Sequence, residues 1–307
     1  MRRSTLLACA AAMFIANGNA AQAACDKVIF SDVGWTDITT TTSIAKHLLE
    51  GLGYKVDLKI LAVPVTYASL KSGDIDVFLG SWIPAQTTMS EPYLKAGEID
   101  QLVVNLEGTK YTLAVPTYTY DAGLKDFKDI AKFAKELDSK IYGIEPGNEG
   151  NTYLIGLTKE NKHDLGKFTV VESSEQGMLA QVKRAVNAKK PVVFLGWEPH
   201  PMNANFSLKY LTGGEEFFGK EGVVYTLTRK DYAKECPNVA ALLKNLKFTL
   251  PMENEIMGKI LDDGQEADKA TAAYMKAHPE TLDGWLAGVT TKDGKPGVPA
   301  VKAKLGL

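Results

Sequence analysis

Short apolar runs alternate with amphipathic segments along the first third of the chain. We expect strands at 27–31, 55–61 and 75–79, and helices at about 39–53 and near 67–72. The longer helix is indicated by Ile44, Leu48 and Leu49, whose spacing places them on one helical face. A strand–helix–strand–helix–strand order predicts a parallel sheet covered by helices.

The same alternation starts again beyond residue 116. We expect strands at 140–144, 168–172 and 191–195, with helices starting at about 152 and covering about 175–187. From about 207 the pattern changes to a strand at 223–228 and several helices that form no lobe of their own. We therefore predict an α/β protein of two lobes, each a mainly parallel sheet flanked by helices. Lobe I would comprise 25–113 and 211–307 and lobe II 114–210, with two crossovers near residues 114 and 210.

Residues 1–24 have the features of a secretory signal peptide. Arg2 and Arg3 precede an apolar run from Leu6 to Ile15, and small residues follow up to Ala24. The apolar run is too short to span a bilayer, and the small residues suit a cleavage site. We therefore expect the mature protein to be exported.

Composition and charge narrow the range of partners. The chain has 45% hydrophobic and 23% charged residues, as in an ordinary soluble globular protein. Of its 35 basic residues two lie in the leader, while all 37 acidic residues lie beyond it. A mildly acidic mature chain argues against a nucleic acid partner and modestly favours a cationic ligand.

Cysteine usage predicts one disulfide. Cys9 belongs to the leader, so Cys25 and Cys236 remain. In the oxidising compartment of an exported protein, a bridge between them is expected. Lipidation of Cys25 is the alternative, although QAAC lacks the usual aliphatic residue three positions before the cysteine.

Two stretches of the chain are near copies that each deliver a tryptophan. They are VFLGSWIP at 77–84 and VFLGWEPH at 193–200, where an apolar run meets a glycine, then Trp82 or Trp197, then a proline. Trp35 follows another expected strand. Open α/β sheets bind ligands beyond the carboxyl ends of their strands, so these indoles are expected to face a cleft between the lobes.

We expect these three indoles in loops directly after strands, beside Gly34, Gly80 and Gly196. Glycine at such a position lets the backbone approach a ligand closely. Packing in a core or interface is the alternative for any single tryptophan, but three equivalent positions favour a site. Trp285, in DGWLAGV, lacks such a placement and is expected to be structural.

A box of aromatic faces suits a quaternary ammonium ion, which cannot donate ordinary hydrogen bonds. Each desolvated face contributes about 0.5–2 kcal/mol, and four faces about 2–8 kcal/mol. Micromolar binding requires about 8 kcal/mol, so burial of methyl groups and a few polar contacts must add the rest. Tyr111, just before the first crossover, is a candidate for the fourth face among 12 tyrosines.

Two polar residues near these positions have alternative roles. Asp37 in GWTD could balance the cation or accept a ligand hydroxyl, or it could cap the following helix. Asn148 in EPGNEG could shape the turn, donate to the ligand, or do both.

The arginine count favours choline over a betaine. Only Arg184 and Arg229 remain beyond the leader, and neither lies in an expected strand-end loop. A betaine carboxylate commonly requires guanidinium or backbone N–H donors, whereas the choline hydroxyl suits Asp37. Backbone amides near Gly147 could still hold a carboxylate, so glycine betaine or proline betaine is the alternative ligand.

The sequence offers little for catalysis. The four histidines have no metal-ligand spacing, and no nucleophile elbow, P-loop or dinucleotide fingerprint occurs, so neither metal nor cofactor is expected. A choline-ester hydrolase would rest on His200 alone. We therefore expect a binding protein rather than an enzyme.

Five motifs resemble those of the substrate-binding proteins of ABC importers for glycine betaine, choline and related quaternary amines. They are GWTD (34–37), GDIDVFLGSWIP (73–84), KYTLAVPTY (110–118), EPGNEG (145–150) and VFLGWEPHP (193–201). The resemblance covers the mature length and implies a two-lobed periplasmic-binding-protein fold that closes around its ligand. It also implies an aromatic box of Trp35, Trp82, Tyr111 and Trp197, with Asp37 and Asn148 as partners of the choline hydroxyl.

This resemblance implies a monomeric periplasmic protein that captures choline, and as a further candidate acetylcholine. Its partners would be the permease and ATPase subunits of an ABC importer. A subunit that presents its ligand to a membrane sensor is the alternative from another functional class.

Overall fold

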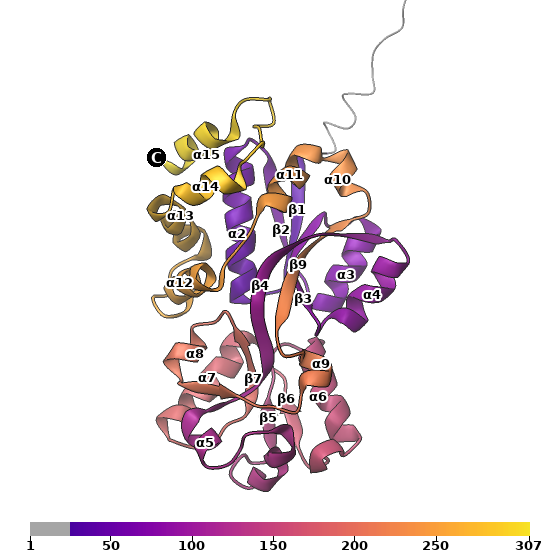
Figure 1. The fold of residues 1–307 in the computed structure, drawn as a ribbon, viewed down its shortest axis with the longest axis vertical. Coiled ribbons are helices and arrows are strands. Elements are labelled where there is room, and N and C mark those ends of the chain that lie inside the picture. The colour runs from indigo at the N-terminus through magenta and orange to yellow at the C-terminus, as the bar shows by residue number, and fades with distance from the viewer. Residues whose placement is uncertain (1–24) are drawn as a thin grey trace, which may run out of the picture.

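The structure is a computed structural model that describes residues 25–307. The leader predicted at 1–24 lies outside the described residues. The described chain forms a mixed α/β protein of two lobes, stacked along its long axis (Figure 1). Its strands are β1 (Lys27–Asp32), β2 (Lys55–Ile60), β3 (Val77–Ile83), β4 (Ile99–Pro116), β5 (Lys140–Tyr142), β6 (Thr169–Val171), β7 (Phe194–Glu198), β8 (Leu208–Tyr210) and β9 (Gly222–Arg229).

The strands form one nine-stranded sheet in the order β2-β1-β3-β9-β4-β7-β5-β6, with β8 paired to β4. The predicted parallel strands form its two ends: β1 lies between β2 and β3, and β5 lies between β6 and β7. Its middle is antiparallel, because β9 and β4 run against their neighbours.

Strand β4 passes from one lobe to the other. Residues from Ile99 to Thr109 pair with β9, and those from Lys110 to Ala114 pair with β7. Figure 1 shows β4 and β9 running side by side along the upper body, with β4 continuing into the lower one. The chain thus crosses between lobes on a continuous strand, while the exact lobe boundaries remain a prediction.

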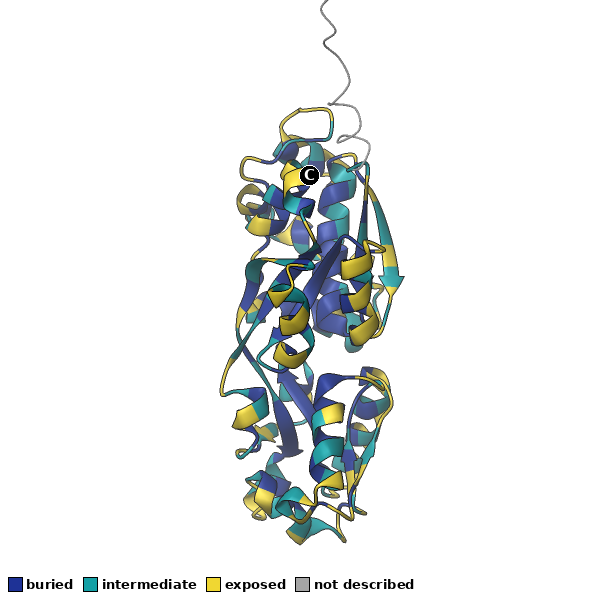
Figure 2. Ribbon diagram, turned by 90° about the vertical axis from the view of Figure 1, so that its right-hand side faces the viewer, coloured by how far each residue is buried: buried dark blue, intermediate teal, exposed yellow. Residues whose placement is uncertain are grey.

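Helices cover both faces of the sheet in lobe I. In Figure 1, α2 lies with α12 to α15 on one side, and α3 and α4 lie on the other. The buried residues follow the strands and the inner faces of these helices, and exposed residues lie on the outer helices (Figure 2). Within residues 25–307, no helix combines the length and apolar character needed to cross a bilayer.

The helices of lobe I are α2 (Thr36–Gly51), α3 (Val63–Ser72), α4 (Thr87–Lys95), α10 (Tyr232–Glu235), α11 (Pro237–Asn245), α12 (Leu250–Leu261), α13 (Ala267–Ala277), α14 (Glu280–Trp285) and α15 (Gly297–Leu305). Those within the predicted lobe II are α5 (Thr117–Asp121), η1 (Phe127–Phe133), α6 (Glu149–Lys159), η2 (Lys162–Asp164), α7 (Glu175–Asn187) and α8 (Met202–Asn205). Helix α9 (Glu215–Phe218) lies in the returning segment that was predicted as part of lobe I.

The predicted disulfide is present. Cys25 and Cys236 are bonded across a sequence separation of 211 residues. The bond joins the segment before β1 to the start of α11, so it ties the last third of the chain to lobe I.

Several helices start about one turn earlier than the apolar periodicity predicts. The helix expected from 39 begins at Thr36, the one expected at 67 begins at Val63, and the one expected at 152 begins at Glu149. First turns are set by capping and by proline rather than by apolar spacing: Pro64 occupies the first turn of α3, and Asn148 caps α6.

The expectation that Trp82 and Trp197 lie in loops is wrong. Strand β3 continues through Trp82, which pairs with Val224, and β7 continues through Trp197, which pairs with Tyr111. Antiparallel neighbours provide hydrogen bonds beyond the glycine that was expected to end each strand. Both indoles still lie within two residues of the carboxyl end of their strand.

Gly80 and Gly196 allow close packing of other parts of the protein and not close approach of a ligand. A Cβ at Gly80 would lie 2.8 Å from the side chain of Ile38, and a Cβ at Gly196 would lie 2.8 Å from that of Ala114. The expected close approach therefore occurs, but it packs helix α2 against β3 and β4 against β7.

Candidate ligand-binding site

Eight residues enclose a cavity of about 260 Å³, part of it open to solvent. We call it the aromatic cavity, and its lining is Trp35, Asp37, Trp82, Tyr111, Ile144, Asn148, Glu149 and Trp197. All six residues predicted as site residues from the sequence are in this lining. Ile144 and Glu149 are the two that the sequence analysis missed.

Seven of the eight lining residues lie at or just after the carboxyl ends of β1, β3, β5 and β7, and Tyr111 lies within β4. Trp35 follows β1 and is the residue before α2, and Trp82 lies near the end of β3. In lobe II, Asn148 follows β5 and Trp197 lies near the end of β7. Because β1 is parallel to β3 and β5 to β7, each lobe presents its strand ends to the shared cavity.

Neighbouring side chains fix the orientation of the rings. The rings of Trp82 and Tyr111 meet edge to face with centroids 6.3 Å apart, and Phe218 packs behind Tyr111 at 5.0 Å. The indole Nε1 of Trp35 donates to both carboxylate oxygens of Glu145 at 3.0 Å. Since the rings already hold their positions, little conformational freedom remains to be lost on binding.

Asp37 lies at the start of α2 but does not cap it. The residue before the helix is Trp35, which makes no side-chain cap, and Asp37 is the second helical residue. Its Oδ2 accepts a hydrogen bond from Trp82 Nε1 at 3.1 Å, whereas the buried Oδ1 lacks a partner among the described residues. The lining of the aromatic cavity therefore contains one unpaired carboxylate oxygen.

The environment of Asp37 disfavours its charge. Burial raises the pKa of this carboxyl to about 8, and the negative charge of Glu175 adds to the rise. Backbone N–H groups at the start of α2 and the Trp82 indole oppose the rise only in part. A cation in the aromatic cavity would favour the ionised form.

Asn148 has the turn-shaping role that the sequence left open, and donation to a ligand stays a prediction. Its Oδ1 accepts from the backbone N–H groups of Gly150 and Asn151 and from the Tyr111 hydroxyl at 2.9 Å. Three donors occupy this oxygen, so it shapes the turn and holds Tyr111. Its Nδ2 lies 3.3 Å from Glu149 Oε2, a long contact that leaves the amide able to donate elsewhere.

Glu149 adds a second acidic group to the lining. It is the first residue of α6, and only 3% of its surface is exposed. Burial raises the pKa of its carboxyl to about 7, and the charge of Glu145 contributes to the rise. Within residues 25–307, the lining thus contains two acidic side chains and no basic one.

The sequence did contain a signal for these acids. Glu145 and Glu149 flank Asn148 within EPGNEG, so a turn that faces a cleft would bring two carboxyls with it. The sequence analysis assigns a role in this turn to Asn148 only.

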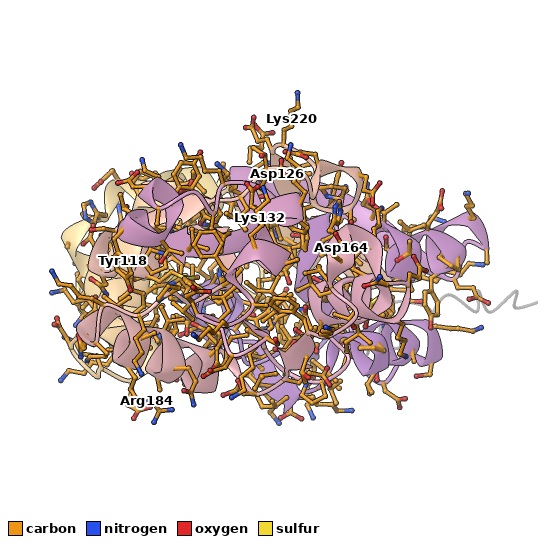
Figure 3. All side chains as sticks on the ribbon, turned by 90° about the horizontal axis from the view of Figure 1, so that it is seen from below. Tyr118, Asp126, Lys132, Asp164, Arg184 and Lys220 are labelled. Carbon is orange, nitrogen blue, oxygen red and sulfur yellow. A yellow bond between two sulfur atoms is a disulfide. The ribbon has the colours of Figure 1, made fainter. Side chains whose placement is uncertain are left out.

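The arginines beyond the leader lie away from the aromatic cavity, as their positions in the sequence indicated. Arg184 is an exposed residue of α7 that projects outward at the edge of the molecule (Figure 3). Arg229 pairs with Asp76 at 2.7 Å and with Glu235 at 2.6 Å in lobe I. Neither guanidinium is positioned to bind a carboxylate between the lobes.

Two further aromatic residues singled out in the sequence lie outside the cavity lining. Trp285 donates to the backbone carbonyl of Lys247 at 3.1 Å and packs against Phe248, which is a structural role. His200 lies behind Trp197 and has both ring nitrogens engaged, one by Glu175 and one by the backbone N–H of Met202. It is therefore poorly placed to act as a general base on a ligand.

The chain is similar to known proteins in sequence and in fold. A family model described as the substrate binding domain of ABC-type glycine betaine transport system matches residues 26–277. An ABC-transporter choline binding protein solved in complex with choline is 56% identical, covers 92% of this chain and 99% of its own, and superimposes with a TM-score of 0.90. An ABC-transporter choline binding protein in an unliganded semi-closed conformation is also 56% identical. It covers 92% of this chain and 100% of its own, with a TM-score of 0.85. Lactococcal OpuAC, closed around glycine betaine, is 25% identical, covers 84% and 98%, and gives a TM-score of 0.75.

Proposed function

Since the chain belongs to the family of substrate-binding domains of ABC-type glycine betaine transport systems, we propose that it binds choline and delivers it to an ABC importer. Acetylcholine, which carries the same trimethylammonium group, is a further candidate ligand. The 56% identity to a protein solved with choline supports this choice over the more distant betaine-binding relative.

The observation that carries the proposal is the unpaired, buried Oδ1 of Asp37 in a cavity with three indoles and a phenol in its lining. Burying a carboxylate without a partner is costly, so a ligand that offers both a cation and a donor is the natural complement. Aromatic faces bind a quaternary ammonium, and the free oxygen can accept a hydroxyl proton.

In the proposed complex, the trimethylammonium group lies among Trp35, Trp82, Tyr111 and Trp197. The choline hydroxyl donates to Asp37 Oδ1 and accepts from Asn148 Nδ2. A hydroxyl has one donor and two acceptor sites, so this pairing satisfies the proton and one lone pair. The Oδ1 atom of Asn148 takes no part, because three protein donors already occupy it.

The charge of the lining favours choline over a betaine. Choline carries only a positive charge, whereas a betaine also carries a carboxylate that would face Asp37 and Glu149. Negative charges within one cavity repel each other. Arg184 and Arg229, which could compensate a betaine carboxylate, lie outside the cavity lining.

We expect purified mature protein to bind choline at micromolar or lower concentration and glycine betaine at least about tenfold more weakly. Tryptophan fluorescence should report both titrations, because three indoles lie in the lining. Acetylcholine in a parallel titration would define the ligand range, and an assay for released acetate would detect hydrolysis. Tighter binding of glycine betaine than of choline would contradict the assignment of the hydroxyl to Asp37.

The proposal includes a location and partners. The predicted leader and the family of the chain support an extracytoplasmic protein, which we place in the periplasm. A monomer would offer its closed form to the permease and ATPase subunits of the importer. A subunit that presents choline to a membrane sensor would bind the same ligand. Choline uptake by cells that lack this protein would distinguish the two, because only an importer subunit is required for uptake.

Choline affinity should rise with pH and choline binding should release protons. In the ligand-free protein the pKa of Asp37 is about 8 and that of Glu149 about 7, so both are partly protonated near neutrality. The cation favours the charged forms, so affinity should increase at least about tenfold between about pH 6 and about pH 8.5. Calorimetry in two buffers of different ionisation enthalpy would measure the protons released. Burial also raises the pKa of Glu145 behind Trp35, so this carboxyl contributes to the same pH dependence.

The stability of the ligand-free protein should change in the opposite direction. A carboxyl whose pKa is raised on folding leaves the folded state with more bound protons than the unfolded state, between about pH 4 and about pH 8. The free energy of unfolding should therefore fall as pH rises through that window.

A pH-independent choline affinity without proton release would contradict the affinity prediction, because it would show that neither carboxyl responds to the ligand.

A further inference from the structure

Glu175 joins the two lobes through a fully buried carboxylate. It is the first residue of α7 in lobe II, and only 1% of its surface is exposed. Its Oε2 accepts from the backbone N–H of Thr36 at 2.8 Å, and its Oε1 accepts from the Thr36 hydroxyl at 2.8 Å. Thr36 belongs to lobe I, so both contacts cross between the lobes.

The same carboxylate is held from behind by His200 of lobe II. His200 Nε2 lies 2.9 Å from Glu175 Oε1, and its Nδ1 accepts from the backbone N–H of Met202 at 2.9 Å. An Nδ1 that accepts must be unprotonated, so the proton is on Nε2 and is donated to Glu175. Three donors therefore converge on one carboxylate.

Helix α2 depends on this contact for its cap. The residue before the helix, Trp35, provides no side-chain cap, and the Thr36 N–H is one of the N-terminal groups left without an intrahelical partner. Glu175 supplies the missing acceptor from the other lobe and places a negative charge at a helix N-terminus, where it is favourable. Separation of the lobes would remove this cap.

The negative charge of Glu175 repels three nearby carboxyls. It raises the pKa of Asp32, Asp37 and Glu145, so these groups are harder to ionise. This repulsion opposes the stabilising effect of the helix cap. The contacts of Glu175 connect two walls of the aromatic cavity, because Thr36 lies between Trp35 and Asp37, and His200 packs edge to face against Trp197 at 4.9 Å.

We propose that Glu175 is a positioning residue that latches the closed form, setting the Trp35–Asp37 wall of lobe I against the Trp197 wall of lobe II. The latch rests on the proposed function for its role in retaining choline, although its effect on closure requires no ligand. The described arrangement matches the choline complex with a TM-score of 0.90 and the semi-closed unliganded form with 0.85, in keeping with a closed state.

The test is Glu175→Gln in the mature, disulfide-bonded protein. An amide has one acceptor oxygen, so one of the donors from Thr36 or His200 would face an N–H group. We expect choline to dissociate about tenfold faster in stopped-flow fluorescence, with the association rate changed less than about twofold. Small-angle scattering of the ligand-free variant should give a larger radius of gyration, which saturating choline restores.

Two further variants separate latching from folding. Thr36→Val removes one donor and keeps the helix, so it should accelerate dissociation by a smaller factor and add little in combination with Glu175→Gln. Glu136→Gln makes the same chemical change on an exposed residue of lobe II and should leave rates and scattering unchanged. If Glu175→Gln does not fold, Thr36→Val alone decides the question.

Two results would overturn the latch. One is a variant with a lower Tm but a wild-type dissociation rate and radius of gyration, which would assign Glu175 a structural role only. The other is wild-type behaviour in every measurement. Failure of the proposed function would look different from failure of the latch. Wild-type protein would then not bind choline, but ligand-free wild type and Glu175→Gln would still differ in radius of gyration.

Discussion

Asp37→Asn should weaken choline binding by about 100-fold, which corresponds to about 2.7 kcal/mol. The change keeps the shape of the side chain but removes its charge. It also creates a conflict of donors, because Trp82 Nε1 already donates to one of the two positions. If the amide oxygen stays with Trp82, the amide nitrogen faces the choline hydroxyl, and if it turns, the nitrogen faces the indole N–H.

The same variant should be no less stable than wild type when choline is absent. Asp37 is buried with a pKa of about 8, so at alkaline pH the wild-type protein bears a charge that the asparagine does not. Thermal unfolding at about pH 8.5 should therefore show an equal or higher Tm for Asp37→Asn. Asp121→Asn, at an exposed position at the end of α5, is the matched control and should change neither property. Unaltered choline affinity in Asp37→Asn would exclude this carboxylate from the site.

The aromatic part of the site could be predicted because it depends on local sequence. A strand that ends in glycine, tryptophan and proline indicates an indole at a strand end, and the carboxyl-end rule for α/β sheets places such ends at a cleft. Trp82 and Trp197 follow this logic, and Trp35 follows an expected strand and a glycine without a proline. Tyr111 needed a different argument, because it lies within β4 and not at a strand end. Its place before the first crossover made it a candidate, and the resemblance supports it.

The charged surroundings could not be predicted because they depend on distant pairs. Glu175 and Thr36 are 139 residues apart in sequence and become neighbours only when the lobes meet. In the sequence, Glu175 is an ordinary acidic residue in the first turn of an amphipathic helix, a common position for which the helix dipole is sufficient reason. Glu149 differs, because its place beside Asn148 in EPGNEG is a local signal for the cavity lining.

Strand lengths illustrate the same limit. Periodicity predicts seven of the nine strands in order and misses β4 and β8. It also ends the strands at Trp82 and Trp197 too early, because glycine and proline indicate strand ends. The antiparallel partners β9 and β4 extend both strands, and these partners come from remote parts of the chain. Cys25 and Cys236 are equally remote, yet their pairing was predictable because only two mature cysteines remained.

Trp82→Ala should weaken choline binding by about 50-fold, which combines the loss of a desolvated ring face with the loss of the hydrogen bond that orients Asp37. Trp197→Ala removes a face without a direct contact to Asp37 and should cost at least about tenfold. Trp82→Phe keeps a ring but not the N–H group, so it should fall between wild type and Trp82→Ala. Calorimetric titration with choline would measure all three.

Trp285→Phe provides the control for a buried tryptophan outside the aromatic cavity. Its indole donates to Lys247 in lobe I, so its loss should lower the Tm while the choline affinity stays unchanged. The contrast matters because a general loosening of the fold would weaken binding in all of these variants alike. If Trp285→Phe reduced affinity as much as Trp82→Ala, or if Trp82→Ala left it intact, the rings would not form the cation site. The expected result is that choline affinity falls moderately in Trp82→Phe, falls further in Trp82→Ala, and stays at the wild-type value in Trp285→Phe. This result requires that the ring face and the indole N–H of Trp82 both contribute to ligand binding.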